Sequence, residues 1–176
     1  MRVFWLKGYD GASLSDLTEA MGINKPSLYA CFENKRALFL SAIEHYNETI
    51  GGANAQKILA GKTFIETTKA YLAATVDTLT SPSSPPGCLV GAVATDMAGR
   101  DEEIRELVAK LVASSEAFLT ERFKELGDAP GDEKALAEAL VSFGQSLAAK
   151  SRVGDTKADL NARSKRFLAI LIGPDH

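Results

Sequence analysis

Lysine, hydroxyl and phenol side chains gather on one short stretch of this chain, at Lys25, Ser27 and Tyr29. Such groups donate hydrogen bonds to phosphate oxygens and base edges, and many proteins that read duplex DNA present them from a helix. Leu28 and Phe32 have the spacing of a buried face on the same helix, so the polar residues are expected to point outward. The stretch therefore predicts a surface that contacts nucleic acid.

The residues before this stretch predict another short helix and a tight turn. Ser13 can cap a helix start, with Asp16 three residues later in a capping-box position. Gly22 has the backbone freedom that ends such a helix. Asn24 can cap the next helix, where the early Pro26 loses no intrahelical hydrogen bond. The first helix has one apolar face, made of Leu14, Leu17 and Met21. Two short helices joined in this way form a helix-turn-helix, whose second helix enters the DNA major groove.

Residues 3–40 resemble the DNA-binding domain of the tetracycline-repressor (TetR) family of bacterial regulators. The resemblance rests on the mutual distances of Gly8-Tyr9, Ser13-Leu14, Asp16-Leu17, Met21-Gly22-Ile23, Ser27-Leu28-Tyr29, Phe32, Lys35 and Leu38-Phe39. It implies a homodimer that binds a pseudo-palindromic operator in double-stranded DNA and releases it on binding a small-molecule effector. By position, the family's phosphate contacts fall on Ser13, Ser15, Tyr29 and Lys35. Its base-reading positions fall on Lys25, Pro26 and Ser27, and Asn24 completes the expected DNA-binding set. Beyond about residue 45 the resemblance is architectural.

The segment ahead of Gly8 is shorter than the first helix of that family, which usually follows a basic arm. Only Arg2–Lys7 remain for it, and so short a helix depends on the packing of Val3, Phe4 and Leu6. Two explanations stay open. The sequence is truncated relative to the natural chain, which we favour, or the protein manages with a shortened DNA-binding domain.

The 176 residues are 45% hydrophobic with a formal net charge of −3, as is typical of soluble globular proteins. No apolar run approaches the roughly 20 residues that span a bilayer, so we expect a cytoplasmic protein without membrane association.

Residues 1–50 hold five basic and six acidic side chains, so DNA binding must rest on a small cluster of Lys25, Lys35 and Arg36. Cys31 and Cys88 are expected to be reduced, packed thiols, with a redox sensor as the alternative.

Hydrophobic periodicity predicts an all-α fold. We expect an N-terminal helix-turn-helix DNA-binding domain at residues 1–46, with a truncated first helix, and a C-terminal helical ligand-binding and dimerisation domain at residues 47–176. A helix capped by Asn34 runs to a break at Gly51-Gly52, and residues 51–62 form a loop or a weak continuation. Further helices are expected at about 63–80, 88–98, 101–126 (capped by Asp101), 132–153 and 156–172, with a loop at 81–87.

The last two predicted helices carry apolar stripes. They are Leu136, Leu140, Phe143 and Leu147 on one helix and Leu160, Phe167, Leu168 and Leu171 on the other. In the TetR family two such helices pair with their mates in a four-helix homodimer interface. A dimer also places two recognition helices on the two halves of a pseudo-palindrome. The alternative is that the stripes only fill the core of one chain.

Aromatic, thioether and polar side chains on the inward faces of the middle helices are expected to line an effector pocket. These are Phe64, Tyr71, Thr75, Met97, Phe118 and Arg122, and plain core packing is the alternative for each. The histidines, His45 and His176, have no ligand-like neighbours apart from Glu48. The sequence has no phosphate loop, nucleophile elbow or di-iron motif, so no catalytic residue, metal or cofactor is expected.

Three functions remain. The first is a ligand-responsive DNA-binding regulator, most often a repressor in the TetR family. The alternative is a helical dimer that binds small molecules or partners but does not bind DNA in this truncated form. An all-α enzyme or carrier is the third. DNA binding distinguishes the first two, and turnover of a substrate would be needed to support the third.

Overall fold

The chain folds into helices joined by short turns and loops. The computed structural model describes residues 1–173, apart from the side chain of Ala92, and this part contains no strand. In chain order the elements are α1 (Arg2–Gly11), α2 (Leu14–Met21), α3 (Lys25–Cys31), α4 (Lys35–Tyr46), the π-helical turn η1 (Asn47–Gly51), α5 (Gly52–Leu59), α6 (Phe64–Leu79), the π-helical turn η2 (Leu89–Ala94), α7 (Thr95–Ala98), α8 (Glu102–Leu126), α9 (Glu133–Arg152) and α10 (Lys157–Ile172). The expected all-α fold class is confirmed. None of the described helices is long and apolar enough to cross a bilayer.

Side-chain caps fix most helix starts, because each cap accepts a hydrogen bond from a backbone N–H that lacks an intrahelical partner. The predicted caps of α2, α3, α4 and α8 are all present: Ser13, Asn24, Asn34 and Asp101. Ser13 and Asp16 form the complete capping box, and Gly22 ends α2 in the left-handed conformation, with φ 65°. These starts could be predicted because each cap involves residues only three positions apart.

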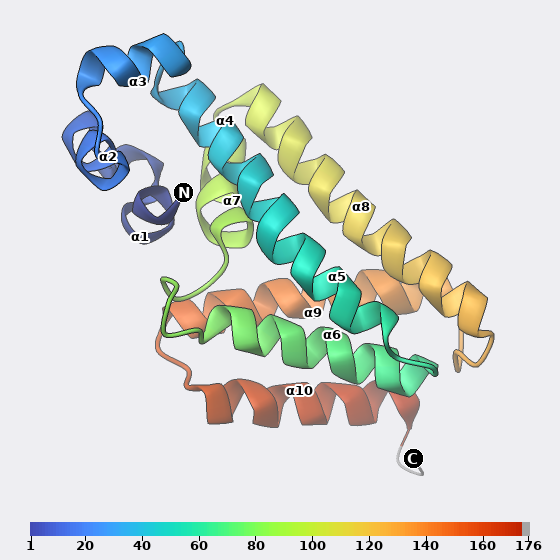
Figure 1. Cartoon of the computed structure of the whole chain (residues 1–176). Helices are drawn as coiled ribbons and strands as arrows, with labels where there is room; N and C mark the ends of the chain where they lie inside the picture. Colours follow the sequence, from blue (N-terminus) through green and yellow to red (C-terminus); the bar gives the residue numbers. More distant parts are fainter. Residues whose placement is uncertain (174–176) are drawn as a thin grey trace.

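The predicted break at Gly51-Gly52 is wrong. The chain continues from α4 through η1 into α5 with ordinary helical dihedrals, φ −61° and ψ −43° at Gly52. Figure 1 shows α4 and α5 as one continuous diagonal rod. Glycine lowers helix propensity by roughly 1 kcal/mol relative to alanine, which tertiary packing overrides here. Residues 51–59 are therefore a helix continuation, the second of the two options expected for this segment.

The later helices lie where the periodicity placed them. α6, α8, α9 and α10 match the predicted ranges to within one residue at each end. The helix expected at 88–98 is divided, because it opens with the π-helical turn η2 before α7. Thr95 closes this turn, since both its N–H and its hydroxyl donate to the carbonyl of Val90, the hydroxyl at 3.1 Å.

Two hydrophobic cores hold the helices together. One joins α1–α4 with η2, α7 and the first half of α8, and the other joins α6, α9 and α10 with the end of α5 and the second half of α8. Figure 1 shows α6, α9 and α10 stacked below the α4–α5 rod and α8. Residues 89–108 thus pack with the N-terminal helices although they come late in the sequence. The domain boundary at residue 46 stays a prediction.

Helix α1 is anchored by Phe4 and Trp5 and not, as predicted, by Leu6. Phe4 and Trp5 are fully buried, whereas Leu6 is 64% exposed. Positions 4 and 5 share the side that faces the core, and position 6 turns past it. Trp5 packs edge-on against Tyr46 of α4, with ring centroids 5.1 Å apart. Gly8, with φ 74°, kinks α1 at the point where the first helix was expected to end.

Candidate nucleic-acid interface and ligand cavity

Helices α2 and α3 form the predicted helix-turn-helix. Gly22 makes the turn between them, and Leu17 and Leu28 are buried at their junction. Met21 was predicted for the same apolar face but is 42% exposed, because it lies at the last position of α2, where the helix leaves the core. The apolar pairing fixes which side of α3 faces outward.

The outward side of α3 presents the predicted polar residues. Lys25, Pro26, Ser27 and Tyr29 are exposed, and Asn24 shapes the helix start by accepting the Ser27 N–H at 2.8 Å. The other three predicted DNA-binding residues flank α3: Ser13 and Ser15, exposed at the start of α2, and Lys35, half-buried at the start of α4. Polar groups on a short exposed helix between two helix starts are suited to a phosphate backbone and the groove beside it.

Several cations near this surface are paired with carboxylates of the chain itself. Lys7 Nζ lies 2.6 Å from an Asp16 carboxylate oxygen. Hydrogen bonds from Lys7 and then Ser13 lower the pKa of Asp16 to about 2. Arg36 donates to the two carboxylate oxygens of Asp101 at 2.5 and 2.8 Å. Arg36, one of the three cations predicted to attract DNA, is therefore paired within the chain.

Lys35 differs from its neighbour Arg36. Its Nζ lies 4.6 Å from the centroid of the Tyr9 ring. A cation–π contact of this kind orients the ammonium group without neutralising its charge. Lys35 thus keeps a positive charge near the start of α4.

The loop between α7 and α8 is tied to the DNA-binding helices by ion pairs. Arg36 on α4 also contacts Glu103 at 2.7 Å, and Arg100 in the loop pairs with Asp10 at the end of α1. Asp101 caps α8 and holds Arg36 with the same carboxylate, and these hydrogen bonds, that of Arg36 first, lower its pKa to about 2. The start of α8 is thereby linked to α4, and the residue before it to α1.

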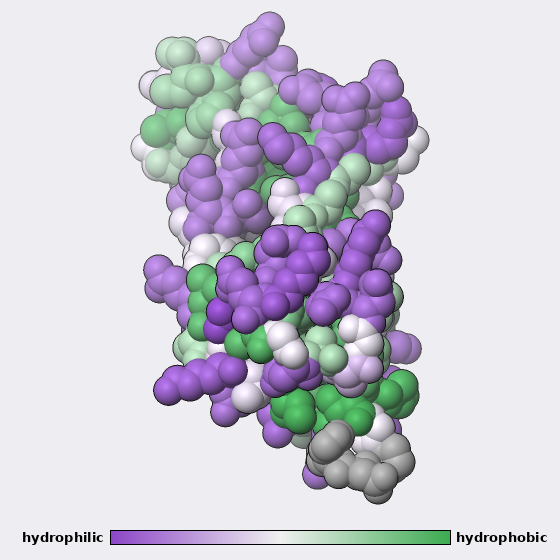
Figure 2. All heavy atoms as spheres, turned by 90° about the vertical axis from the view of Figure 1, so that its right-hand side faces the viewer, coloured by the Kyte–Doolittle hydropathy of each residue, from purple (hydrophilic) through white to green (hydrophobic). Residues whose placement is uncertain are grey.

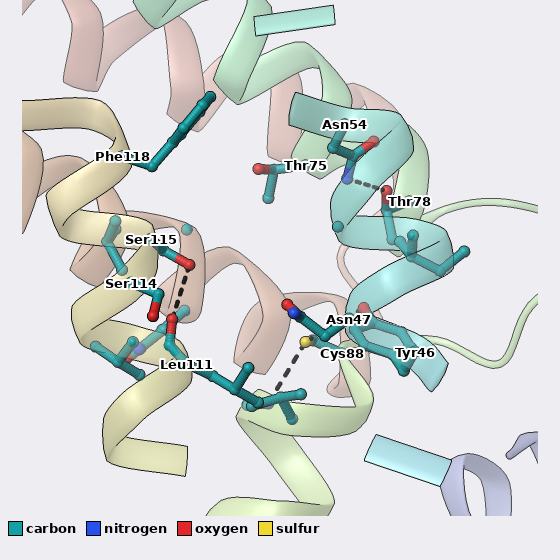
Figure 3. A pocket seen from close by; sticks show the side chains of 18 of the residues that line it. Tyr46, Asn47, Asn54, Thr75, Thr78, Cys88, Leu111, Ser114, Ser115 and Phe118 are labelled. Atoms are coloured by element: carbon teal, nitrogen blue, oxygen red, sulfur yellow. Dashed lines mark hydrogen bonds between the residues drawn. The ribbon is translucent and has the colours of Figure 1, made fainter. Parts of the chain in front are cut away.

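A cavity of about 890 Å³ lies between the two cores (Figure 3). Its walls come from the α4–η1–α5 rod, α6, the η2 segment, the middle of α8, and α9. Both π-helical turns contribute to the wall, for example through Gly51 and Gly91. Cavities of this size hold drug-sized molecules, and π-helical turns occur frequently at functional sites.

Apart from the carboxylates of Glu48 and Glu116, the polar side chains of the cavity wall are uncharged types, and some of them bond to one another. Tyr46 donates its hydroxyl to Cys88 Sγ at 3.4 Å, and Asn54 Nδ2 donates to Thr78 Oγ1 at 3.0 Å. Burial and then the neighbouring Cys88 raise the pKa of Tyr71 to about 12, so this phenol stays protonated. The wall therefore combines apolar surface with a few oriented hydrogen-bonding groups.

Three of the six predicted pocket residues line this cavity, namely Tyr71, Thr75 and Phe118. Tyr71 fits against α9 because Gly144 leaves room for it: a Cβ at Gly144 would lie 2.6 Å from the Tyr71 hydroxyl. In Figure 3, Phe118 projects from α8 on the left, and Thr75 of α6 lies toward the centre of the view.

The other three predicted residues lie elsewhere. Phe64 is buried against Phe123, with ring centroids 4.7 Å apart, and Met97 belongs to the core around the DNA-binding helices. Arg122 donates to the carbonyls of Leu59 at 3.3 Å and Gly61 at 2.7 Å, so it caps the end of α5. Periodicity identifies an inward face but does not tell whether that face meets a cavity or a packed core.

Sequence reasoning missed several residues of the cavity wall, among them Tyr46, Asn47, Asn54 and Cys88. Asn47 and Asn54 are seven residues apart, which places two amides on one face of a long helix, and this signal could have been used. It was lost because a break was assumed at Gly51-Gly52. Cys88 is half-buried beside the cavity, whereas Cys31, expected to be packed, is exposed.

Comparison with known families assigns both halves of the chain. Residues 1–42 match the bacterial regulatory proteins of the tetR family, and residues 65–162 match the C-terminal domain of LmrA/YxaF-like transcriptional regulators. The chain belongs to the TetR family. It is thus a helix-turn-helix transcriptional regulator of a non-enzymatic family. The resemblance seen at residues 3–40 is confirmed, and the second match extends it through the helical domain.

Individual relatives of this TetR-family chain include proteins named as repressors. It is 30% identical to the transcriptional repressor ComR of Escherichia coli (strain K12) over 161 residues, 88% of this chain and 76% of ComR. It is 26% identical to the regulator YezE of Bacillus subtilis (strain 168) over 92% of this chain and 84% of YezE. Among solved structures, a cysteine mutant of the regulator CifR complexed with 26-bp operator DNA matches with a TM-score of 0.87 and 32% identity, covering 95% of this chain and 90% of CifR.

Proposed function

We propose that this TetR-family regulator is a repressor that binds a pseudo-palindromic operator as a homodimer and releases it when a small molecule fills the cavity. The observation that carries the proposal is the position of the cavity. Its wall includes the rod that continues α4 and the η2 segment, and both pack on the DNA-binding helices.

The proposed DNA face is the exposed side of α3 with its two flanking helix starts. Ser13, Ser15, Tyr29 and Lys35 are assigned to phosphates. Asn24, Lys25, Pro26 and Ser27 are assigned to the end of α3 that enters the groove, where bases are read. The exposure of seven of these eight residues supports the assignment, as does the likeness to CifR, which was crystallised with its operator.

The proposed homodimer forms through α9 and α10. Phe143 and Phe167 stack across these two helices with centroids 3.9 Å apart, and neither ring is fully buried. Ile170, near the end of α10, is 78% exposed, and a hollow of about 200 Å³ lies beside these three side chains. Figure 2 shows hydrophobic residues gathered at the lower end of the molecule. Apolar side chains clustered on two helices are typical of a twofold interface.

Effector binding would act by population shift. A ligand lying between the two cores contacts η1 and η2 on one side and α6 and α9 on the other. It therefore favours the arrangement of the cores that gives the better fit. Coupling of this kind amounts to roughly 1–3 kcal/mol, a 5- to 150-fold change in operator affinity. The tilt of α4 would change the distance between the recognition helices of the dimer.

The test begins with DNA. The purified protein is used to select duplexes from a randomised pool at low salt, and we expect enrichment of a pseudo-palindrome with half-sites about one helical turn apart. A chemically varied library is then screened for thermal stabilisation. Compounds that stabilise the protein are expected to weaken its binding to the selected duplex.

The outcomes distinguish the candidates. Stabilising compounds without any enriched duplex would favour a helical dimer that binds small molecules and not DNA. Enriched DNA whose affinity no stabilising compound changes would refute effector-controlled release.

A further inference from the structure

We infer that the effector of this regulator carries no negative charge: the cavity takes uncharged or cationic organic molecules and excludes carboxylates and phosphates. The inference rests on the proposed effector function of the cavity and specifies its ligand chemistry. It comes from the charges, the donors and the acceptors of the wall.

The wall contains no lysine, arginine or histidine among the residues that the structure describes. Its two charged residues are both acids, Glu48 and Glu116. An anion that leaves water for a largely apolar cavity needs a cation or several free donors, because its desolvation costs several kcal/mol even after relaxation. Glu116, which is half-buried, and Glu48, which is exposed, add a repulsion that solvent weakens. A neutral molecule escapes both penalties, and an ammonium group is attracted to the acids.

Arg122 is the cation that the sequence analysis expected in the effector pocket. It does not line the cavity because its side chain is bonded elsewhere. Its guanidinium donates to the Gly61 carbonyl at 2.7 Å and contacts Glu125 at 2.9 Å. These bonds satisfy carbonyls at the end of α5, so turning Arg122 toward the cavity would leave them unpaired. Its Nε is buried without a hydrogen-bond partner, but Arg122 is not among the residues that line the cavity.

Two hydroxyl groups of the wall already use their proton within their own helices. The Ser115 hydroxyl donates to the Leu111 carbonyl at 3.0 Å, and the Thr78 hydroxyl donates to the Ala74 carbonyl at 2.9 Å. The proton of each hydroxyl is used within its own helix, whereas the oxygen can still accept. Figure 3 shows Ser115 and Thr78 on opposite sides of the cavity. Such a wall suits ligand hydroxyl, amide or ammonium groups, which donate, better than a carboxylate, which only accepts.

The surroundings of Tyr71 also disfavour a negative charge. Burial first and then Cys88 raise its pKa to about 12, so the environment disfavours a negative charge on the phenol oxygen. A carboxylate placed beside this oxygen would meet the same low polarity and the same neighbours.

The test compares matched alcohol, amine and carboxylate forms of straight-chain and phenylalkyl skeletons of several lengths. Thermal shift and calorimetric titration of the full chain give affinities. We expect alcohols or amines to bind at least about tenfold more tightly than the carboxylates of the same skeleton, about 1.4 kcal/mol. A carboxylate that binds as tightly as its alcohol would overturn the inference. If no form of any skeleton binds and the library screen also finds no ligand, the effector proposal itself fails, and the inference falls with it.

Adding a cation to the cavity wall tests whether its absence is what excludes carboxylates. Gln145 of α9 lines the cavity but is exposed enough to accept a longer side chain. Gln145→Lys supplies the missing cation and is expected to improve carboxylate binding about tenfold relative to Gln145→Met, which has similar length without charge. Carboxylates that bind the two variants equally would show that the missing cation is not what excludes them.

Discussion

At the scale of single residues, the proposed DNA face relies on a few cations whose positions in the sequence do not reveal their roles. Lys35 and Arg36 are neighbours, yet Arg36 is held by Asp101 while Lys35 rests on the ring of Tyr9. The first 50 residues carry more acids than bases, so each free cation has a large share in attracting phosphates.

Lys35→Ala is expected to weaken binding equally for all DNA sequences, because a phosphate contact carries no sequence information. The slope of log affinity against log salt should fall by about 0.9, the value for one phosphate. Lys25→Ala is the matched comparison and should instead change the preference for one base pair, by roughly 1–3 kcal/mol. Affinities for the selected operator and an unrelated duplex, measured over a range of salt, separate the two roles. An unchanged slope for Lys35→Ala would remove Lys35 from the DNA face.

Gly144 shows how one missing methyl group shapes the cavity. Gly144→Ala is expected to destabilise the protein by roughly 1–3 kcal/mol, because the new Cβ would lie 2.6 Å from the Tyr71 hydroxyl. In a Tyr71→Phe background the nearest remaining ring atoms lie 3.4 Å away. There the same substitution is expected to be neutral or to stabilise by up to about 1 kcal/mol, through the helix propensity of alanine. Denaturant unfolding of the four proteins tests this, and equal destabilisation in both backgrounds would contradict it.

At the scale of elements, the sequence predicted what depends on near neighbours. The caps Ser13, Asn24, Asn34 and Asp101 were identified because each acts within its own first turn. The continuity of α4 through Gly51 was missed, since it depends on the packing of α5 against α6 and not on the local residues. The lining residues of the cavity were hard to predict for the same reason, because they depend on contacts between distant parts of the chain. Whether Phe64 or Phe118 meets a ligand depends on which helix lies opposite, and periodicity does not contain that information.

The π-helical turn η1 can be tested with two adjacent glycines. A Cβ at Gly52 meets open space, so Gly52→Ala is expected to stabilise the protein by up to about 1 kcal/mol through helix propensity. A Cβ at Gly51 would lie 3.1 Å from Asn47 Oδ1 and would press on a residue of the cavity wall. Gly51→Ala should therefore gain less stability than Gly52→Ala and should displace the Asn47 side chain, which Gly52→Ala leaves in place although Gly52 also lines the cavity. Thermal unfolding and titration with a stabilising compound provide both measurements, and identical behaviour of the two variants would count against a role for η1.

At the scale of the whole molecule, the proposed dimer makes a direct prediction. Ile170→Glu places a charge on the exposed apolar end of α10 and is expected to shift the protein toward monomer and to weaken operator binding, because one monomer reads only one half-site. Leu59→Glu is the matched control, an equal chemical change at a 48% exposed leucine at the end of α5. Sedimentation velocity over a range of concentrations reports the assembly state. A dimer that survives Ile170→Glu but not Leu59→Glu would place the interface elsewhere.

The ion pairs at the α7–α8 loop connect the cavity with the DNA face. Helix α8 lines the cavity at its middle, and its N-cap Asp101 holds Arg36 of α4. In the proposed function, a ligand that moved α8 would therefore pull on the first turn of α4, immediately after α3. Arg100 and Asp10 make a parallel connection to α1.

Asp101→Asn separates this connection from the cap, because asparagine caps a helix about as well as aspartate but cannot form an ion pair with Arg36. We expect the variant to fold with slightly reduced stability and to show a smaller loss of operator affinity when the effector binds. The pKa of Asp101 is lowered from 3.8 to about 2, so its pairing stabilises the folded state above pH 4 and is lost as the pH falls from about 4 toward 2. The stability difference between the original protein and Asp101→Asn should thus be constant near neutral pH and shrink across that acidic range.

Glu103→Gln is the control, because it removes the more exposed partner of Arg36. It should have little effect on the stability or on the loss of operator affinity when the effector binds. If Asp101→Asn keeps full effector response, the coupling must run through other contacts, such as the packing of Trp5 on Tyr46.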